Sequence, residues 1–145
     1  MTEHVLVAID GSDPSWEALA YTAERYADDR ITILNIVDPL EGVYGGMEAG
    51  YYDPDAFERA RERGETICER ARERLAEAGV LEALSIETVV EIGRPSRAIV
   101  DYATEAEVDH VVIGSHGRGG VSRILLGSVA ETVVRRSPVP VTVVR

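Results

Sequence analysis

The chain has 145 residues, with 15 basic and 26 acidic side chains and a formal net charge of −11 at pH 7. This length predicts one domain, and the acidic balance argues against nucleic acid as a main partner, because a phosphate backbone requires clustered positive charge. No apolar run approaches the roughly 20 residues that span a bilayer, and the acidic residues among the first twenty positions argue against a signal peptide. We therefore expect a cytoplasmic protein without a membrane partner.

Every basic side chain is arginine, and the chain contains no lysine. Because the self-repulsion of an acidic surface is screened at high ionic strength, this composition favours a halophilic protein; the alternative is a GC-rich genome, which also favours arginine. The only cysteine, Cys68, excludes an intrachain disulfide and a cysteine metal cluster. It lies within a helical pattern of apolar residues, which predicts a core residue, with a redox role as the alternative.

The first half of the chain alternates short apolar runs with helical patterns. Residues 5–9 form a continuous apolar run, which is typical of a strand buried on both faces. Asp13 and Pro14 then predict a helix N-cap followed by proline at the first helical position, and the helical spacing of apolar residues continues to Ala27. Residues 31–37, rich in β-branched side chains, predict the second strand.

Residues 39–55 show no useful periodicity. A connection of this length in a compact domain is usually a functional lid, an interaction loop or a disordered segment. Pro54 begins a long helical pattern that runs to about Ala78, and Gly79 predicts its end.

The second half continues the alternation of strand and helix patterns. The predicted elements are a strand over 86–92, a helix opened by Ser96, a strand over 111–113, a helix over 128–136 and a last strand over 139–144. The order βαβαβαβαβ predicts an α/β fold with a mainly parallel sheet and helices on both faces. Ligands of such sheets bind beyond the carboxyl ends of the strands, where the strand order reverses.

Four residues between the fourth strand and the last helix form a pattern that suits an anion: Gly114, Gly117, Gly127 and Ser128. The glycines let the backbone turn sharply and approach a ligand closely, and we expect the turn at Gly127 to use positive φ. The first turn of the helix leaves N–H groups unpaired, and its dipole favours negative charge. Together these features predict a phosphate site, to which the Ser128 hydroxyl adds a donor.

In this stretch the sequence resembles the universal stress protein family. The family signature is intact: glycine, two residues, glycine, nine residues, glycine, and then serine or threonine. The resemblance extends along the whole chain, through segments 5–12, 33–38, 93–95, 109–114 and 138–144. It implies one universal stress protein-like nucleotide-binding domain over residues 1–145, built on an open five-stranded parallel sheet of order 3-2-1-4-5. The switch between strands one and four then coincides with the glycine-rich segment.

The resemblance also implies roles for individual residues. Asp10 would lie beside the nucleoside, the backbone of Ala8 near adenine, and Ile36 against the base. The phosphates would be held by the backbone of Gly114, Ser115, His116, Gly117 and Arg118, and by that of Gly127, Ser128 and Val129. Asn35 stands where histidine is common in the family, and we expect little consequence because Ile36 carries the contact with the base.

Several of these residues have a structural alternative. Ser128 and Glu131 form Ser-x-x-Glu, a capping box, so Ser128 can serve only its own helix. Asp10 can shape a turn with Gly11, and His116 can be a solvated loop residue.

Arg118 and Arg123 are candidates for neutralising phosphate, with ordinary surface arginine as the alternative. His4 and His110 stand at strand entrances and are assigned no role. Competing motifs are missing from the sequence: a Walker A loop requires lysine, the dinucleotide fingerprint is incomplete, and there is no nucleophile elbow.

The sequence therefore predicts a stress-response or regulatory protein that binds ATP or a related adenine nucleotide, with Mg²⁺ or Mn²⁺ held largely by phosphate oxygens and water. One alternative is a slow ATP hydrolase or nucleotidyl-transferring enzyme, for which Asp10 is the acidic candidate near the site. Another is a dimeric interaction module with a vestigial pocket. Because the last strand is apolar and expected at a sheet edge, we also predict a homodimer paired through Val141, Val143 and Val144.

Overall fold

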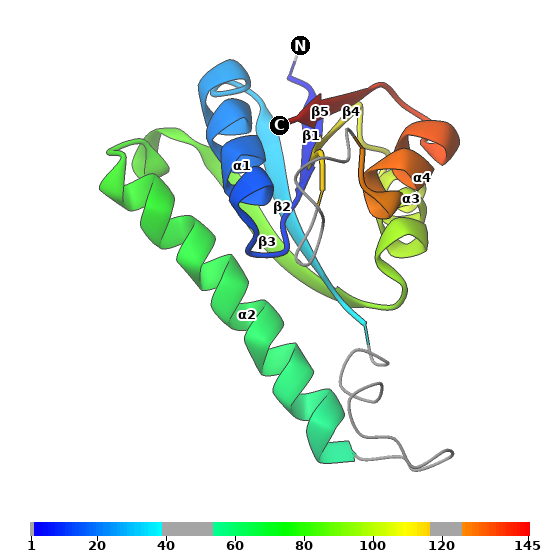
Figure 1. Ribbon diagram of the computed structural model, residues 1–145. Helices are drawn as coiled ribbons and strands as arrows, with labels where there is room; N and C mark the ends of the chain where they lie inside the picture. The colour runs from blue at the N-terminus through cyan, green and yellow to red at the C-terminus, as the bar shows by residue number, and fades with distance from the viewer. Residues whose placement is uncertain (1, 39–53, 117–125) are drawn as a thin grey trace.

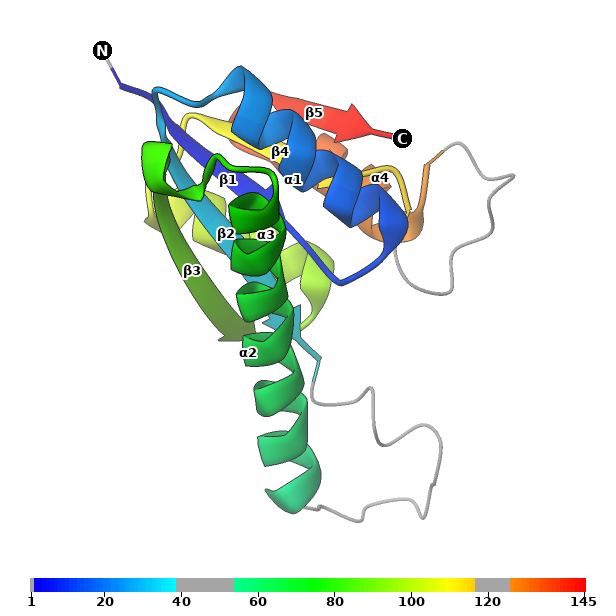
Figure 2. The same ribbon diagram turned by 90° about the vertical axis from the view of Figure 1, so that its left-hand side faces the viewer.

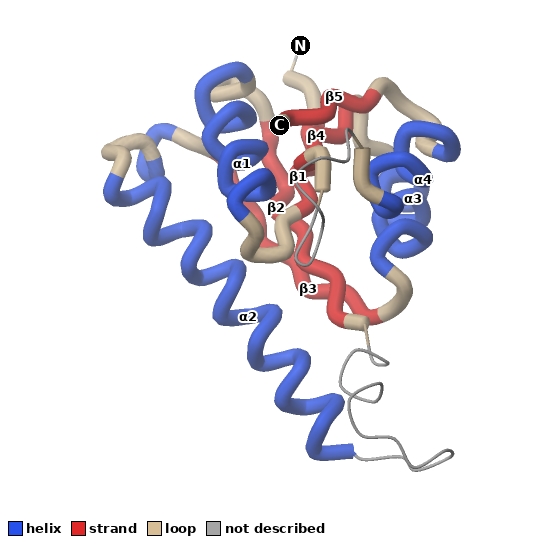
Figure 3. The backbone as a smooth tube through the Cα atoms, in the orientation of Figure 1, coloured by secondary structure: helices blue, strands red, loops and turns tan. Residues whose placement is uncertain are grey.

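The computed structural model of the chain describes residues 2–38, 54–116 and 126–145. Within these ranges, five parallel strands form one sheet of order β3-β2-β1-β4-β5, which confirms the predicted topology (Figures 1 and 3). The strands are β1 (His4–Ala8), β2 (Arg30–Val37), β3 (Ser85–Ile92), β4 (His110–Gly114) and β5 (Val141–Val144). The strand order reverses between β1 and β4, so a ligand site is expected at their carboxyl ends.

Helices cover both faces of this sheet. They are α1 (Asp13–Arg25), α2 (Pro54–Glu77), α3 (Pro95–Glu105) and α4 (Ser128–Arg136), with a short 3-10 turn at Leu81–Ala83. Helices α1 and α2 pack on one face and α3 and α4 on the other, each pair over its own buried apolar cluster. Among the described helices, none is both long and apolar enough to cross a membrane.

Successive residues of the central strand β1 belong to the two clusters in turn. Val5 and Val7 face α1 and α2, whereas Leu6 and Ala8 face α3 and α4, and the first three of these side chains are fully buried. A strand covered on both sides has no polar face, which explains why its sequence is a continuous apolar run.

The start of α1 differs from the predicted cap by one residue. Ser12 is the N-cap, and its hydroxyl accepts a hydrogen bond from the Ser15 N–H at 3.3 Å. Asp13 is instead the first helical residue, where its negative charge is favoured by the helix dipole. The helix also ends at Arg25, two residues earlier than Ala27.

The last strand begins at Val141 rather than at the predicted Val139. Pro140 has no N–H to donate to the ladder, and it contributes only its carbonyl, which accepts a hydrogen bond from the Val111 N–H at 3.0 Å. The predicted stop of α2 at Gly79 is confirmed by a left-handed φ of 76°. The connection predicted over 39–55 falls almost entirely outside the described residues.

Helix α2 lies very close to β2 and β3 because Gly64 has no side chain. A Cβ atom at this position would lie 2.7 Å from Oδ1 of Asn35 and 2.9 Å from Cγ2 of Val37. Glycine inside a helix costs about 1 kcal/mol relative to alanine, and this close approach is the structural reason for it. One turn further on, Cys68 is 5% exposed, which confirms its assignment to the core.

Candidate functional site

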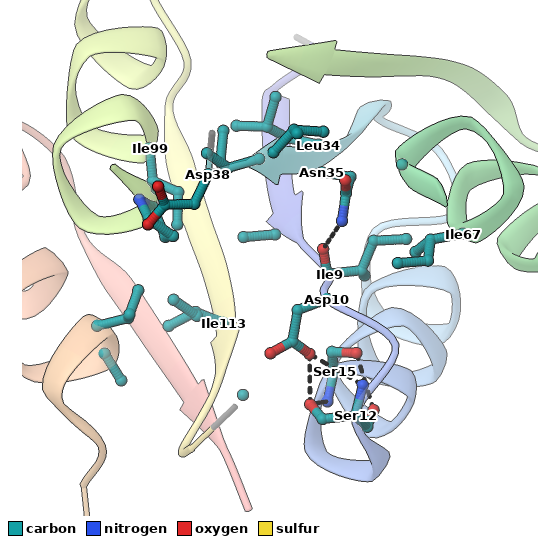
Figure 4. A pocket seen from close by; sticks show the side chains of 18 of the residues that line it. Ile9, Asp10, Ser12, Ser15, Leu34, Asn35, Asp38, Ile67, Ile99 and Ile113 are labelled. Atoms are coloured by element: carbon teal, nitrogen blue, oxygen red, sulfur yellow. Dashed lines mark hydrogen bonds between the residues drawn. The ribbon is translucent and has the colours of Figure 1, made fainter. Parts of the chain in front are cut away.

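A cavity of about 500 Å³ lies at the carboxyl edge of the sheet, where the strand order reverses (Figure 4). It is lined by the ends of β1, β2 and β4, by the turn before α1, and by residues of α1, α2, α3 and α4. The volume is in the range of small-molecule and cofactor sites, about 300–1,000 Å³. The chain therefore forms a ligand-sized cavity at the position that the topology predicts.

Most of the residues selected from the sequence line this one cavity. They are Ala8, Asp10, Ile36, Gly114, His116, Gly127, Ser128 and Val129. Gly117, Arg118 and Arg123 lie outside the described residues. The structure thus brings together segments separated by more than a hundred residues in the sequence.

Ser115 is the exception among the described candidates, because it does not line the cavity. Its side chain is buried, and its backbone N–H donates to the Val144 carbonyl at 2.7 Å. Its own carbonyl accepts a hydrogen bond from the Gly127 N–H at 2.6 Å. These bonds join β4 to β5 and to the start of α4, so the backbone of Ser115 serves the fold.

Asp10 shapes a turn and also lines the cavity. Its Oδ1 accepts hydrogen bonds from both the N–H and the hydroxyl of Ser12, the N-cap of α1. Gly11, between them, has a φ of 88°, which glycine adopts without strain. Figure 4 shows the Asp10 carboxylate at the centre of the site, beside the end of β1. The turn-forming alternative is therefore confirmed, and the carboxylate keeps its place in the cavity wall.

Gly114 is required by packing within the protein. A Cβ atom at this position would lie 2.8 Å from the carbonyl carbon of Pro14 and 2.9 Å from its Cβ. The absence of a side chain at the end of β4 thus lets the first turn of α1 pack against the strand.

The expectation of positive φ at Gly127 is wrong, because the residue has a φ of −71° and a ψ of 164°. A Cβ atom here would lie 3.0 Å from Cα of His116 and 3.2 Å from the Ser115 carbonyl oxygen. The glycine is therefore needed for the close approach of two backbone segments.

Helix α4 begins at the cavity without a side-chain cap. Gly127 is the N-cap and Ser128 the first helical residue, so the predicted capping box is wrong. Glu131 instead pairs with Arg135 at 2.8 Å. Helix geometry leaves the N–H groups of the first turn without intrahelical partners. These groups belong to three residues that all line the cavity: Ser128, Val129 and Ala130.

The remaining wall of the cavity is largely apolar, with charged groups at a few positions. Leu34, Ile99 and Ile113 contribute side chains from β2, α3 and β4. The charged residues of the described wall are Asp10, Asp38 and Arg63. A hydrophobic pocket with a few polar groups and helix N-termini in its wall suits a ligand that has an apolar ring and an anionic end.

Sequence reasoning missed the contribution of α2 and the residue that follows β2. Asp38 could have been found, since it follows a strand whose carboxyl end borders the switch point. Arg63 and Ile67 could not, because a helical pattern does not show where a long helix lies relative to a neighbouring strand.

The fold and the cavity define an open, doubly wound α/β protein with a ligand-sized cavity at its topological switch point. Residues 1–145 match the model of the universal stress protein family. Universal stress protein YxiE of Bacillus subtilis is 33% identical over 152 aligned positions, which cover all of both chains. The chain belongs to the universal stress protein family.

Solved structures of the family have the same architecture. Universal stress protein UspA from Lactobacillus plantarum is 26% identical, with a TM-score of 0.78 over 99% of this chain and 97% of its own. A universal stress protein solved in complex with cAMP is 28% identical, with a TM-score of 0.69 and the same coverage of both chains.

Proposed function

We propose that this universal stress protein binds ATP in the cavity and acts in a stress-response or regulatory role. The observation that carries the proposal is the first turn of α4, whose N–H groups border the cavity without a side-chain cap. Such a turn combines unpaired donors with the positive end of the helix dipole and is suited to phosphate. The apolar wall opposite offers a surface for a planar base.

The parts of the cavity suit the parts of a nucleotide. Ile36 and the backbone of Ala8, on β2 and β1, would contact adenine, and the Asp10 carboxylate would accept hydrogen bonds from the ribose. Phosphates would then lie at Gly127, Ser128 and Val129. The 28% identical universal stress protein that was solved with cAMP supports an adenine nucleotide as the ligand class.

A divalent cation would depend on the nucleotide for most of its ligands. Within the described residues, no group of three or more histidine, cysteine, aspartate or glutamate residues could hold a metal ion. Mg²⁺ or Mn²⁺ would therefore be bound through phosphate oxygens and water, as these hard cations commonly are.

Two measurements test the proposal. Mass spectrometry of the small molecules released from freshly purified protein should identify an adenine nucleotide. Calorimetric titration should then give saturable binding of ATP, with GTP and inorganic phosphate as controls. If nothing is released and ATP does not bind at millimolar concentration, the cavity is vestigial and the protein is an interaction module.

A catalytic role is the second candidate, because the Asp10 carboxylate lies in the cavity wall and could orient water at a bound phosphate. Turnover of ATP well above the uncatalysed rate, lost in Asp10→Asn while ATP remains bound, would support an ATP hydrolase or a nucleotidyl-transferring enzyme. Turnover that persists in Asp10→Asn would exclude Asp10 as its base.

We also propose a homodimer paired through β5, which is an edge strand bonded only to β4 within the described sheet (Figure 2). The carbonyls of Pro140 and Val144 accept hydrogen bonds from the N–H groups of Val111, in β4, and Ser115, which follows it. The alternate residues Val141 and Val143 therefore direct their backbone groups away from β4. The four residues of β5 are only half-buried. An apolar strand with a free edge favours pairing with a second copy.

A further inference from the structure

Asn35 is a buried polar residue that joins the ends of two strands beside the cavity. Its side chain is 4% exposed, and its Nδ2 donates a hydrogen bond to the Ile9 carbonyl at 2.9 Å (Figure 4). Ile9 is also bonded through its own N–H to the Leu34 carbonyl at 2.9 Å. Both polar groups of the Ile9 backbone are therefore held by β2, one through the main chain and one through the Asn35 amide.

The bond to Ile9 fixes the backbone at the point where Asp10 begins. The Ile9 carbonyl belongs to the peptide unit that leads into Asp10, and Asp10 then turns through Gly11 to the N-cap of α1. Ile9 is still bonded to β2 after the strand ends, and Oδ1 of Asp10 is held by Ser12 on the other side of the turn. The peptide between Ile9 and Asp10 therefore links the sheet to this turn, and its direction contributes to that of the Asp10 side chain. Asn35 fixes that peptide.

Helix α2 in turn holds the Asn35 amide in place. A Cβ atom at Gly64 would lie 2.7 Å from Oδ1 of Asn35, so the helix backbone packs directly on the amide and restricts its rotation. Because Asn35 and Gly64 also line the cavity, a chain of contacts runs from α2 through Asn35 and Ile9 to Asp10.

We propose that Asn35 is a positioning residue for nucleotide binding, which orients the Asp10 carboxylate toward the ligand through the Ile9 carbonyl. This inference rests on the proposed function, since it concerns the affinity for an adenine nucleotide. It differs from the expectation that the change from the family's common histidine has little consequence. The residue at position 35 contributes a buried hydrogen-bond donor, and a histidine ring N–H can supply one as well.

The decisive variant is Asn35→Leu, which keeps a buried side chain of similar size and removes the donor. Thr32→Val is the matched control on the same strand, because Thr32 is fully buried and shares a 2.7 Å hydrogen bond with Nε2 of His4, at the amino end of β2. Each variant removes the hydrogen bonding of one buried side chain, so each should lower the melting temperature by about 3–6 °C. Only Asn35→Leu should weaken ATP binding, by about tenfold in calorimetric titration, and Asn35→His should restore the affinity.

A double-mutant cycle with Asp10→Asn shows whether Asn35 acts through Asp10. In the Asp10→Asn background, Asn35→Leu should reduce affinity by less than twofold, whereas two independent sites would give the full tenfold loss. Gly64→Ala disturbs the same Asn35 amide from α2, because the added Cβ would lie 2.7 Å from its Oδ1. It should reproduce the loss of affinity in the parent background.

The outcomes separate this inference from the proposed function. A parent protein that binds no adenine nucleotide overturns both. A parent that binds ATP, together with Asn35→Leu and Thr32→Val variants of equal affinity, overturns only the role of Asn35. If Asp10→Asn abolishes binding, the double-mutant cycle cannot be measured. The role of Asn35 is then tested by the comparison of Asn35→Leu with Thr32→Val and by the rescue with Asn35→His.

Discussion

Replacing Ser128 with alanine separates ligand contact from helix stability at α4. Ser128 is exposed, occupies the first helical position and makes no capping hydrogen bond, while alanine is the better helix former. The free energy of unfolding should therefore change by less than about 0.5 kcal/mol, or roughly 1–2 °C in melting temperature. A lost hydrogen bond to a charged phosphate costs about 1.5–3 kcal/mol, so the affinity for ATP should fall about ten- to a hundredfold.

The assay combines thermal melts of the nucleotide-free protein with calorimetric titration of ATP. Thr132→Ala is the matched control, because Thr132 is a half-buried hydroxyl residue on the same helix that donates to the Ser128 carbonyl at 3.0 Å and does not line the cavity. It should bind ATP like the parent. A Ser128→Ala protein with parental affinity and a melting temperature several degrees lower would refute both the phosphate site and the helix start described above.

Further expectations concern the backbone at the site, the surface charge, the sheet edge and the single thiol. Gly127→Val should lower both the melting temperature and the affinity for ATP, because its Cβ would lie 3.0 Å from Cα of His116. A melting temperature equal to that of the parent protein would contradict this. For a chain of net charge −11, the melting temperature should rise steeply from low to molar KCl, beyond the screening that is complete near ~0.15 M, and a flat profile would count against salt adaptation. Light scattering at micromolar concentration should give a dimer for the parent and a monomer for Val143→Pro, and a monomeric parent would exclude pairing through β5. Burial raises the pKa of the Cys68 thiol from 9.0 to about 11, so iodoacetamide at pH 8 should alkylate the folded protein about a hundredfold more slowly than the unfolded one; equal rates would show that the thiol is not buried.

The strands could be predicted because they are short segments rich in apolar and β-branched residues, and the parallel sheet because strands and helices alternate along the chain. The strand order was implied by the resemblance to the universal stress protein family. The helix starts were less accurate. At α1 the residues Ser12 and Asp13 are both good N-caps, and only the hydrogen bond to Ser15 shows which one serves. At α4 the Ser-x-x-Glu pattern was misleading, because Gly127 rather than Ser128 occupies the cap.

The site was predicted where it depends on strand ends and was missed where it depends on packing. Asp10 and Gly114 follow directly from the topology, since parallel strands end at the same edge. Arg63 and Gly64 depend on how closely α2 approaches β2, and that distance is set by the fit of Gly64 against Asn35. The sign of φ at Gly127 could not be predicted either, because glycine adopts both signs readily.

The packing of Pro14 against Gly114 changes what the glycine signature can report about other members of the family. Both Gly114 and Gly127 lie where a Cβ atom would meet the protein's own backbone, at 2.8 Å and 3.0 Å, so a chain that had lost its ligand would still favour glycine at these two positions for packing. Ser128 is under no such constraint, because it is exposed and caps nothing. We expect the residue after the third glycine, rather than the glycines themselves, to distinguish chains that bind nucleotide from those that do not.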